Sequence, residues 1–437
     1  MTTDLSATSS EVVETNSLRE ITLFCAVLLV EIYSLAVSFG GPFFEVGYFL
    51  LVVISQTFAG AYIWAQLRQS DKTLPLPELL AMGFAIGSAS AAISQLIIRD
   101  LLGIRLFLSP LVPIIGVAIW LVTKRDPQLP VKVTHATTNT LLWLLFPAPL
   151  AMMTYSMFLL PVFIAPLLLA IYIAQRKETL PKNLTINLFT ALSLLMLAES
   201  IIQRISFVAL TKTKIGIDPY ADDIRFDVVH AIASAQWGIS TNAELANQSY
   251  AYYKISFLWL APITNFDSRS LLNLSVTVIP VFLITVAGAS LWAITRRLSK
   301  HHMAAGIATI LLFTQTNFRG DSEINLRSVW LLGTIYLLSA GVFYIKTINR
   351  DSIKNLAILF VIGFVIAGTR ITLVPMMVAL SFLPNDGDNQ INRKFLITRL
   401  QQLTVISLGV VIAIFIFTRG ENSTLFNSVF LSSADWP

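Results

Sequence analysis

The side chains best suited to chemistry in this sequence are two adjacent aspartates, Asp222 and Asp223. A carboxylate held against a hydroxyl group can take its proton, so either aspartate could serve as a general base. Neighbouring residues on a helix point about 100° apart, so only one of the two can face a substrate. Acidic residues at this place would also cap the start of a helix, which is the structural alternative to catalysis.

The two aspartates begin a segment, 222–238, whose pattern predicts a helix of about four turns that ends at a glycine. Polar residues at i, i+4, i+7 and i+11 share one face of this helix: Asp223, Asp227, His230 and Ser234. Apolar residues occupy the opposite face: Ile224, Phe226, Val228, Ile232 and Ala235. We therefore expect a helix along the membrane surface whose acidic face points toward a cavity. The alternative is that the acidic face is only the solvated side of a surface helix.

A second element follows at 248–262, and it combines many aromatic residues with a single lysine, Lys254. We count Tyr253 and Lys254 as candidates for binding a substrate. The alternative is an interfacial aromatic belt, which would place Tyr250 and Trp259 at the membrane boundary.

The elements that must position these residues are membrane helices. Of the 437 residues, 55% are apolar and 13% are charged, and the mean hydropathy is +0.72. A soluble domain carries roughly 25% charged residues, so a soluble globular protein is excluded. The one cysteine, Cys25, lies in an apolar run, which excludes a disulfide-built secreted protein. The net charge of +5 is typical of basic cytoplasmic loops and does not imply nucleic acid.

Up to thirteen apolar stretches approach the length of about 20 residues that a membrane crossing needs. They lie at about 21–38, 43–66, 78–98, 106–123, 139–155, 157–175, 185–209, 271–293, 303–318, 328–346, 355–368, 371–383 and 401–418. The pairs within 139–175 and 355–383 are interrupted, so the count is about 11 to 13. Keeping all thirteen with a cytoplasmic N-terminus puts the basic connections inside. This predicts an all-α, multi-pass protein of the cell membrane, with Arg370 at the outer turn of a helical hairpin.

The chain divides into three parts in this scheme. Residues 1–20 are polar and acidic, as expected of a short cytoplasmic tail. Residues 21–184 supply six spans, and residues 185–437 supply seven. The long connection, 210–270, is extracytoplasmic and contains the 222–238 helix. Loops of this length in a compact architecture are usually functional.

This arrangement resembles the GT-C superfamily of membrane glycosyltransferases, in the branch of protein O-mannosyltransferases and aminoarabinose transferases. That branch carries Asp-Glu-x-Arg-Tyr in its first outer loop, followed by a helix with small residues and a glycine. Here the string from Asp222 to Phe226 is Asp-Asp-Ile-Arg-Phe, and Gly238 follows. Aspartate replaces the glutamate and phenylalanine replaces the tyrosine. The seven spans of 185–437 equal the number in the conserved module of the superfamily.

The resemblance implies transfer of a sugar from a polyprenyl-phosphate donor to an extracytoplasmic acceptor, which would be a glycan, a lipid or a protein. It makes Asp222 or Asp223 the general base, and inversion at the sugar needs no enzyme nucleophile. The leaving phosphate calls for a cation at the outer surface, and the candidates are Arg225, Lys254, Arg327 and Arg370. Arg370 ranks first, and its structural alternative is an arginine that snorkels to the interface. Further candidates for binding substrate are Asp227, His230 and Tyr253.

The next outer loop, 319–327, carries Asp321 and Glu323, which match a second acidic motif of some GT-C members. The two carboxylates could assist the base or hold a divalent cation. A short charged turn is the plainer explanation. No histidine and carboxylate spacing indicates zinc, and the sequence implies no other cofactor.

Functions of other classes stay open at this point. Glu31 and Glu199 lie in predicted spans, where acids are costly and often relay protons, and they favour a transporter or flippase of a lipid-linked glycan. A local cluster of Glu199 with Gln203 and Arg204 is the simpler explanation. A polysaccharide polymerase or ligase would centre on loop arginines, whereas this loop is more acidic than basic. A structural scaffold is the last class.

Overall fold

The computed structural model describes fourteen stretches of the chain: 18–38, 42–68, 73–104, 109–123, 132–134, 221–238, 254–264, 267–276, 278–299, 304–305, 308, 328–347, 353–382 and 393–418. Helices make up nearly all of them, which confirms the all-α prediction. Within these stretches, strands are limited to one parallel pair, β1 (Thr73–Pro75) and β2 (Lys132–Thr134). The predicted spans at 139–155, 157–175 and 185–209 lie outside the described residues, and so does the span at 303–318 except for 304–305 and 308.

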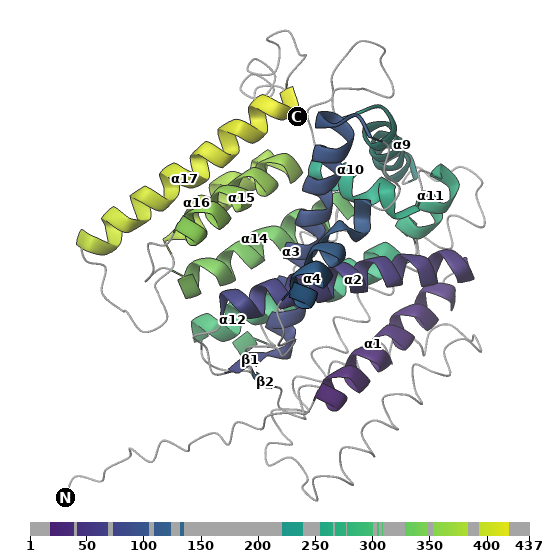
Figure 1. Cartoon of the computed structure of the whole chain (residues 1–437), viewed down its shortest axis with the longest axis horizontal. Helices are drawn as coiled ribbons and strands as arrows, with labels where there is room; N and C mark the ends of the chain where they lie inside the picture. The colour runs from purple at the N-terminus through teal and green to yellow at the C-terminus, as the bar shows by residue number, and fades with distance from the viewer. Residues whose placement is uncertain are drawn as a thin grey trace, which may run out of the picture.

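Among the described residues, five helices are long and apolar enough to cross a membrane. They are α2 (Phe43–Leu67), α3 (Leu76–Leu96) with its extension η1 (Ile97–Leu101), α12 (Val278–Ser299), α14 (Ser328–Thr347) and α17 (Arg393–Thr418). The same part also holds α1 (Leu18–Ser38), η2 (Ser109–Leu111), α4 (Val112–Thr123), α15 (Ile353–Thr369) and α16 (Val374–Ser381). These helices pack into one bundle, in which α1 and α17 lie on opposite flanks (Figure 1).

The bundle is built on close helix crossings through glycine. A methyl group on Gly60 of α2 would lie 2.0 Å from the carbonyl oxygen of Gly83 on α3. A methyl group on Gly87 would lie 2.0 Å from the carbonyl oxygen of Gln56. Small residues let helix backbones approach this closely, which is how helices associate in lipid. The pairing of these positions also shows that α2 and α3 are antiparallel.

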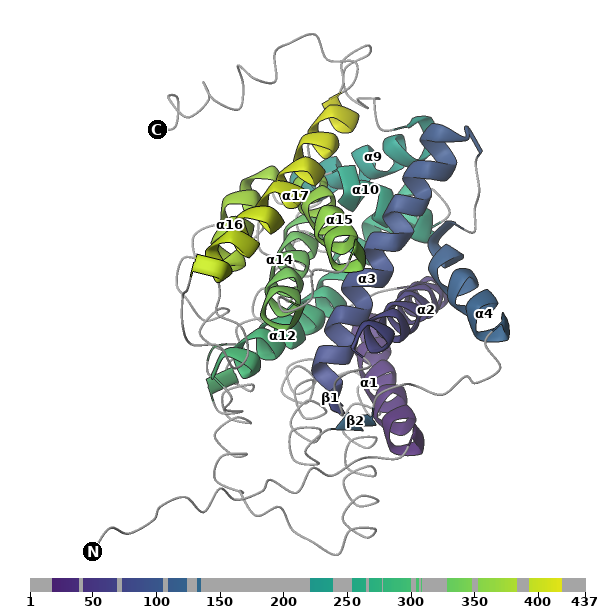
Figure 2. The same cartoon turned by 60° about the vertical axis from the view of Figure 1, so that its left-hand side comes forward.

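Helix α4 covers the outer side of α2, as Figure 2 shows. Val117 of α4 is buried against Ala59 and Tyr62 of α2. On the far flank, α17 presents a row of exposed apolar side chains: Leu396, Leu400, Leu408, Val411 and Phe415. Exposed apolar surface of this extent is characteristic of a membrane protein.

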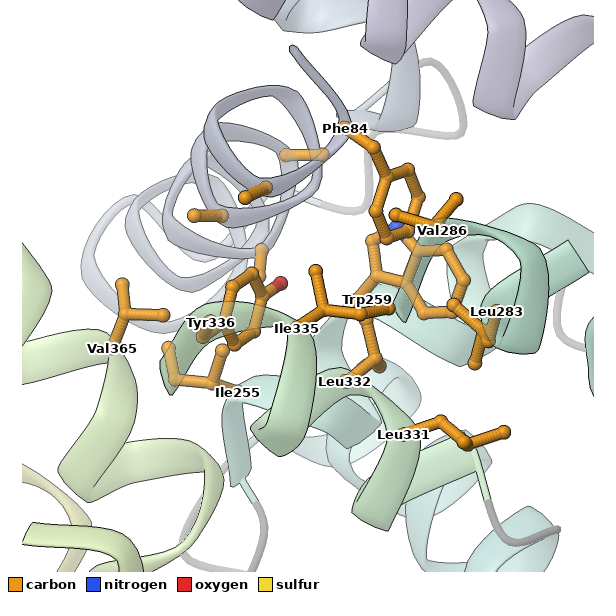
Figure 3. Close-up of a cluster of buried hydrophobic side chains, with 14 of the residues drawn as sticks. Phe84, Ile255, Trp259, Leu283, Val286, Leu331, Leu332, Ile335, Tyr336 and Val365 are labelled. Atoms are coloured by element: carbon orange, nitrogen blue, oxygen red, sulfur yellow. The ribbon is translucent and has the colours of Figure 1, made fainter. Parts of the chain in front are cut away.

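A short helix, α10 (Lys254–Leu260), penetrates the bundle. Its Ile255 and Trp259 side chains point in among residues of α3, α12, α14 and α15 (Figure 3). The indole Nε1 of Trp259 donates a hydrogen bond to Gln56 Oε1 at 2.9 Å, and Gln56 Nε2 donates to the carbonyl oxygen of Pro110 at 3.0 Å. Trp259 is therefore a core residue, and the interfacial-belt alternative is wrong for it. Tyr250 lies outside the described residues.

The two ends of the bundle carry different side chains. At one end Glu78, in the first turn of α3, pairs with Arg297 of α12, with 2.7 Å between Oε2 and Nε. Because α2 and α3 are antiparallel, Arg68 after α2 belongs to the same end. At the other end Arg99 of η1 contacts α9 (Ala221–Trp237), and we call this the α9 end.

Two predicted spans are wrong in their extent. The stretch 271–293 belongs to two helices, because α11 (Ser268–Val276) is rich in polar residues and the apolar α12 begins only at Val278. The stretch 371–383 forms a 3₁₀ turn, η6 (Ile371–Leu373), and then α16 with eight residues. A helix of that length spans about 12 Å, whereas the hydrocarbon core is about 30 Å thick.

The contacts of α15 and α16 with α14 give the direction of the chain on either side of Arg370. The methyl carbon of Thr369 lies 3.6 Å from where a methyl group on Gly333 would be. Thr369 ends α15 and Gly333 is near the start of α14, so these two packed helices run in opposite directions. Leu380 of α16 lies 3.7 Å from where a methyl group on Gly341 would be, and Gly341 is farther along α14 than Gly333. Helices α14 and α16 therefore run in the same direction. The chain therefore reverses at Arg370.

One buried hydrogen bond joins α3 to α14 and allows a direct measurement. The hydroxyl oxygens of Ser88 and Tyr336 lie 3.0 Å apart in the bundle interior. We expect a coupling free energy of about 0.6 to 1.7 kcal/mol between them, as for other hydrogen bonds between membrane helices. Thermal unfolding of Ser88→Ala, Tyr336→Phe and the double variant would give this value by a double-mutant cycle. Additive effects of the two substitutions would contradict it.

Candidate functional site

Helix α9 forms where the sequence predicts it. It begins at Ala221 and ends at Trp237, and the Gly238 N–H donates to the Ser234 carbonyl oxygen at 3.1 Å. Gly238 has a φ of +102°, a conformation that glycine adopts without strain from a side chain, and this ends the helix. The first turn carries both aspartates, where negative charge suits the helix dipole. The side chains of Asp222, Asp223 and Arg225 lie outside the described part.

Three polar side chains of α9 that the structure describes are buried. Asp227 is 3% exposed and His230 is 1% exposed, and Ser234 is buried beside them. The apolar face is buried too, so the exposed residues among the described side chains of α9 are Val229 and Trp237. The alternative of a solvated face is wrong for Asp227 and His230. The reason is that α10, η4 (Ala261–Thr264) and α11 pack on α9. The side chain of Asp223, which shares this face, lies outside the described part.

His230 is fixed between two aromatic rings. Its ring centroid lies 4.0 Å from that of Phe226 on the same helix and 5.9 Å from that of Phe257 on α10. Its Nδ1 lies 2.9 Å from the carbonyl oxygen of Phe226, and because a carbonyl only accepts, Nδ1 carries the hydrogen. These contacts give His230 a role in joining α9 to α10.

Lys254 is the first residue of α10, and its side chain is fully buried. Next to it, Ile255 packs on the end of α15: its Cγ1 lies 2.7 Å from where a methyl on Gly368 would be. Helix α10 thus contacts α9 on one side and the end of α15 on the other. This arrangement brings Lys254 and the Arg370 turn to the α9 end of the bundle. Tyr253 lies outside the described residues.

Arg370 occupies an extended backbone position between α15 and η6, with φ −163° and ψ 106°. Its Nε donates to Thr372 Oγ1 at 2.8 Å, and its guanidinium lies over the Trp330 ring of α14. A cation over an indole face is a favourable contact. The side chain of Arg370 is half-buried, and its contacts with Thr372 and Trp330 hold it at the end of the bundle.

Asp321, Glu323 and Arg327 lie outside the described residues, as does Glu199, and so does the side chain of Glu31. In the part of the chain that the structure describes, no three His, Cys, Asp or Glu side chains come together as a metal site would require.

Sequence reasoning missed one residue at this end, Arg99. It lies directly after the predicted span at 78–98 and is not among the predicted site residues, yet its Nε donates to the carbonyl oxygen of Gln236 on α9 at 3.0 Å. The available signal was the charged pair Arg99-Asp100 directly after a predicted span.

Asp267 caps α11 at the α9 end. Its carboxylate accepts hydrogen bonds from the N–H groups of Ser270 at 3.1 Å and Arg269 at 3.2 Å. Hydrogen bonding from Ser270 holds the pKa of Asp267 below its ordinary value. A lowered pKa stabilises the fold above the ordinary carboxyl pKa, and this contribution is lost as the pH falls through the folded-state value.

We therefore expect Asp267→Ala to destabilise the protein by about 1 kcal/mol at pH 7, because a helix cap is lost. Asp267→Asn retains the cap and should cost less than half as much. Thermal unfolding of both variants in detergent would measure this. The deficit of Asp267→Ala should shrink as the pH falls below the ordinary carboxyl pKa of about 3.9 and through the lower folded-state pKa. Equal melting of the two variants at pH 7 would refute the assignment.

Comparison of this chain with protein-family models, with curated proteins and with solved structures gave no match. The residues that bear on function are gathered at one end of the bundle. At the α9 end, these are a helix that starts with two aspartates, a fully buried lysine and an arginine at a helix reversal.

Proposed function

We propose that this protein is a GT-C-like membrane glycosyltransferase that moves a sugar from a polyprenyl-phosphate donor to a glycan, lipid or protein acceptor. Asp222 or Asp223 is the general base, and Arg370 binds the donor phosphate. One observation carries the proposal: α10 packs both on α9 and on the end of α15. A base and a phosphate-binding cation must both lie near the bond between sugar and phosphate, and α10 links the elements that bear them.

In the proposed reaction, the carboxylate takes the proton of the acceptor hydroxyl as its oxygen attacks the anomeric carbon. The bond from that carbon to the phosphate oxygen breaks, and the electron pair leaves with the polyprenyl phosphate. Arg370 stabilises this anion, with Lys254, Arg225 and Arg327 as the further candidates. A fixed cation at a developing negative charge is often the largest contribution to such a rate.

Asp227 and His230 have a different role in this proposal. Both are almost fully buried, so we assign them to the packing of α9 on α10 and not to contact with the substrate. Both residues thus help to hold the helix that begins with the aspartates.

The experiment is a turnover assay with the full chain in liposomes. A panel of radiolabelled polyprenyl-phosphate sugars is supplied together with an extract of membrane lipids and glycans as the source of the acceptor. Release of polyprenyl phosphate is followed, with protein-free liposomes that carry the same extract as the control. We expect cleavage of one donor. Movement of an intact lipid-linked glycan between leaflets would instead support a transporter or flippase. Transfer of a preformed glycan from its lipid carrier to a second glycan, with release of that carrier, would support a polymerase or ligase. No reaction with any donor would contradict the proposal.

A further inference from the structure

The end of α3 departs from regular helical geometry. Residues Ile97–Leu101 form a π-helical turn, η1, in which the N–H of Leu102 donates to the carbonyl oxygen of Ile97 at 3.0 Å. Such turns are rare, and they are often found at functional sites. A π turn holds one residue more than the α-helical turn it replaces, so it changes the direction of the side chains that follow. Here the two charged residues of the turn, Arg99 and Asp100, both lie against α9.

Arg99 binds the C-terminal turn of α9. Its Nε donates to the carbonyl oxygen of Gln236 at 3.0 Å, and its Nη2 donates to the same oxygen. The last four carbonyl groups of a helix have no partner within the helix. A cation at this end also interacts favourably with the helix dipole. Arg99 therefore satisfies one of these carbonyls and ties α9 to α3, although the two residues are 137 positions apart.

Asp100, the next residue of η1, lies beside Gly238, the residue that follows α9. A methyl group on Gly238 would lie 2.6 Å from Asp100 Oδ1, so a side chain at this position would displace the carboxylate. Gly103 provides a comparison, because its φ is also positive, at +67°, and nothing lies within 4 Å of its methyl position. A side chain at Gly238 therefore meets an obstacle that a side chain at Gly103 does not.

We propose that Arg99 and Asp100 form a latch that positions α9 on the end of α3, with Arg99 as the principal positioning residue. The latch fixes the helix whose first turn bears the two aspartates. The importance of this positioning for sugar transfer rests on the proposed function, whereas the contacts of Arg99 and Asp100 with α9 do not. The effect of the latch on transfer would be large, because a misplacement of about 1 Å can cost about a hundredfold in rate.

Hydrogen exchange of the full chain in nanodiscs tests the latch without any substrate. We expect Arg99→Gln to speed exchange of the α9 amides by about tenfold or more, while α12 and α14 stay unchanged, because local opening is then easier. Arg99→Lys keeps a cationic donor and should fall between the wild type and Arg99→Gln. Arg269→Gln, which removes an exposed charge from α11, is the matched control and should leave α9 unchanged.

A second set of variants tests the Asp100 contact. Gly238→Ala is expected to speed α9 exchange, because its φ of +102° strains alanine and because the methyl group meets the Asp100 carboxylate. Adding Asp100→Ala to Gly238→Ala should not reduce the effect if only the φ matters, and should change it if the carboxylate contributes. Gly103→Ala is expected to leave α9 exchange unchanged. If Arg99→Gln does not fold, these variants still test whether contacts at the end of α3 position α9. Unchanged α9 exchange in both Arg99→Gln and Gly238→Ala would overturn the latch. Faster exchange throughout the bundle would also overturn it, because that result shows general loss of stability.

Turnover kinetics separate the latch from the proposed reaction. Positioning predicts that Arg99→Gln lowers kcat by about 10- to 100-fold and changes KM for the donor by less than about threefold. Arg99→Lys should restore part of kcat. If α9 exchange rises as expected and the wild type cleaves no donor, the latch stands and the proposed function fails. If exchange rises and kcat is unaffected, the positioning role is overturned.

Discussion

Replacement of the catalytic aspartate by asparagine is expected to slow sugar transfer by about 10²- to 10⁴-fold, the usual contribution of a general base. Asparagine keeps the size of the side chain but does not take a proton from the acceptor. Since adjacent helical residues point about 100° apart, only one of Asp222→Asn and Asp223→Asn should show this loss. The other variant should keep most of its activity.

The measurement is kcat for donor cleavage in liposomes across a range of pH. The wild-type rate should fall on the acid side as the base is protonated, and the inactive variant should lack this dependence. Asp267→Asn is the matched control, because it makes the same substitution at the same end of the bundle and retains its helix cap. Full activity in both Asp222→Asn and Asp223→Asn would remove the aspartates from the mechanism.

Gly87→Ala is expected to destabilise the bundle by about 3 kcal/mol or more, at the upper end of the cost of overpacking. The added methyl group would lie 2.0 Å from the backbone oxygen of Gln56, so α2 and α3 would have to separate. Separation also disturbs the side chain of Gln56, which accepts a hydrogen bond from Trp259 of α10. The substitution therefore strains the crossing and the helix that joins α9 to the bundle.

Thermal unfolding in nanodiscs, together with the yield of folded protein, would measure this effect. Gly116→Ala on α4 is the matched control, because nothing lies within 4 Å of its methyl position. There the substitution should be neutral or slightly stabilising, since alanine is the better helix former. Equal melting temperatures for Gly87→Ala and Gly116→Ala would contradict the close crossing of α2 and α3.

The sequence by itself determined the features that depend on local chemistry. A chain with 13% charged residues in long apolar stretches can satisfy its backbone in lipid as helices, and helices are what the structure has. The 222–238 helix ends at Gly238 because glycine alone adopts the required φ without strain. The helix break at Gly368-Thr369-Arg370 followed from a glycine and a charge inside an apolar run, and α15 does end at Thr369.

Tertiary structure alone decided which faces are covered. The spacing of Asp227 and His230 placed both residues on one face of α9. Their burial depends on α10, which packs on α9. Trp259 fits an aromatic belt by composition, and it is a core residue because Gln56, 203 positions away, accepts its indole hydrogen. Arg99 acquired a partner only when α9 was placed at the end of α3. Contacts of this kind join distant segments, and the periodicity of one segment carries no information about the segment that packs on it.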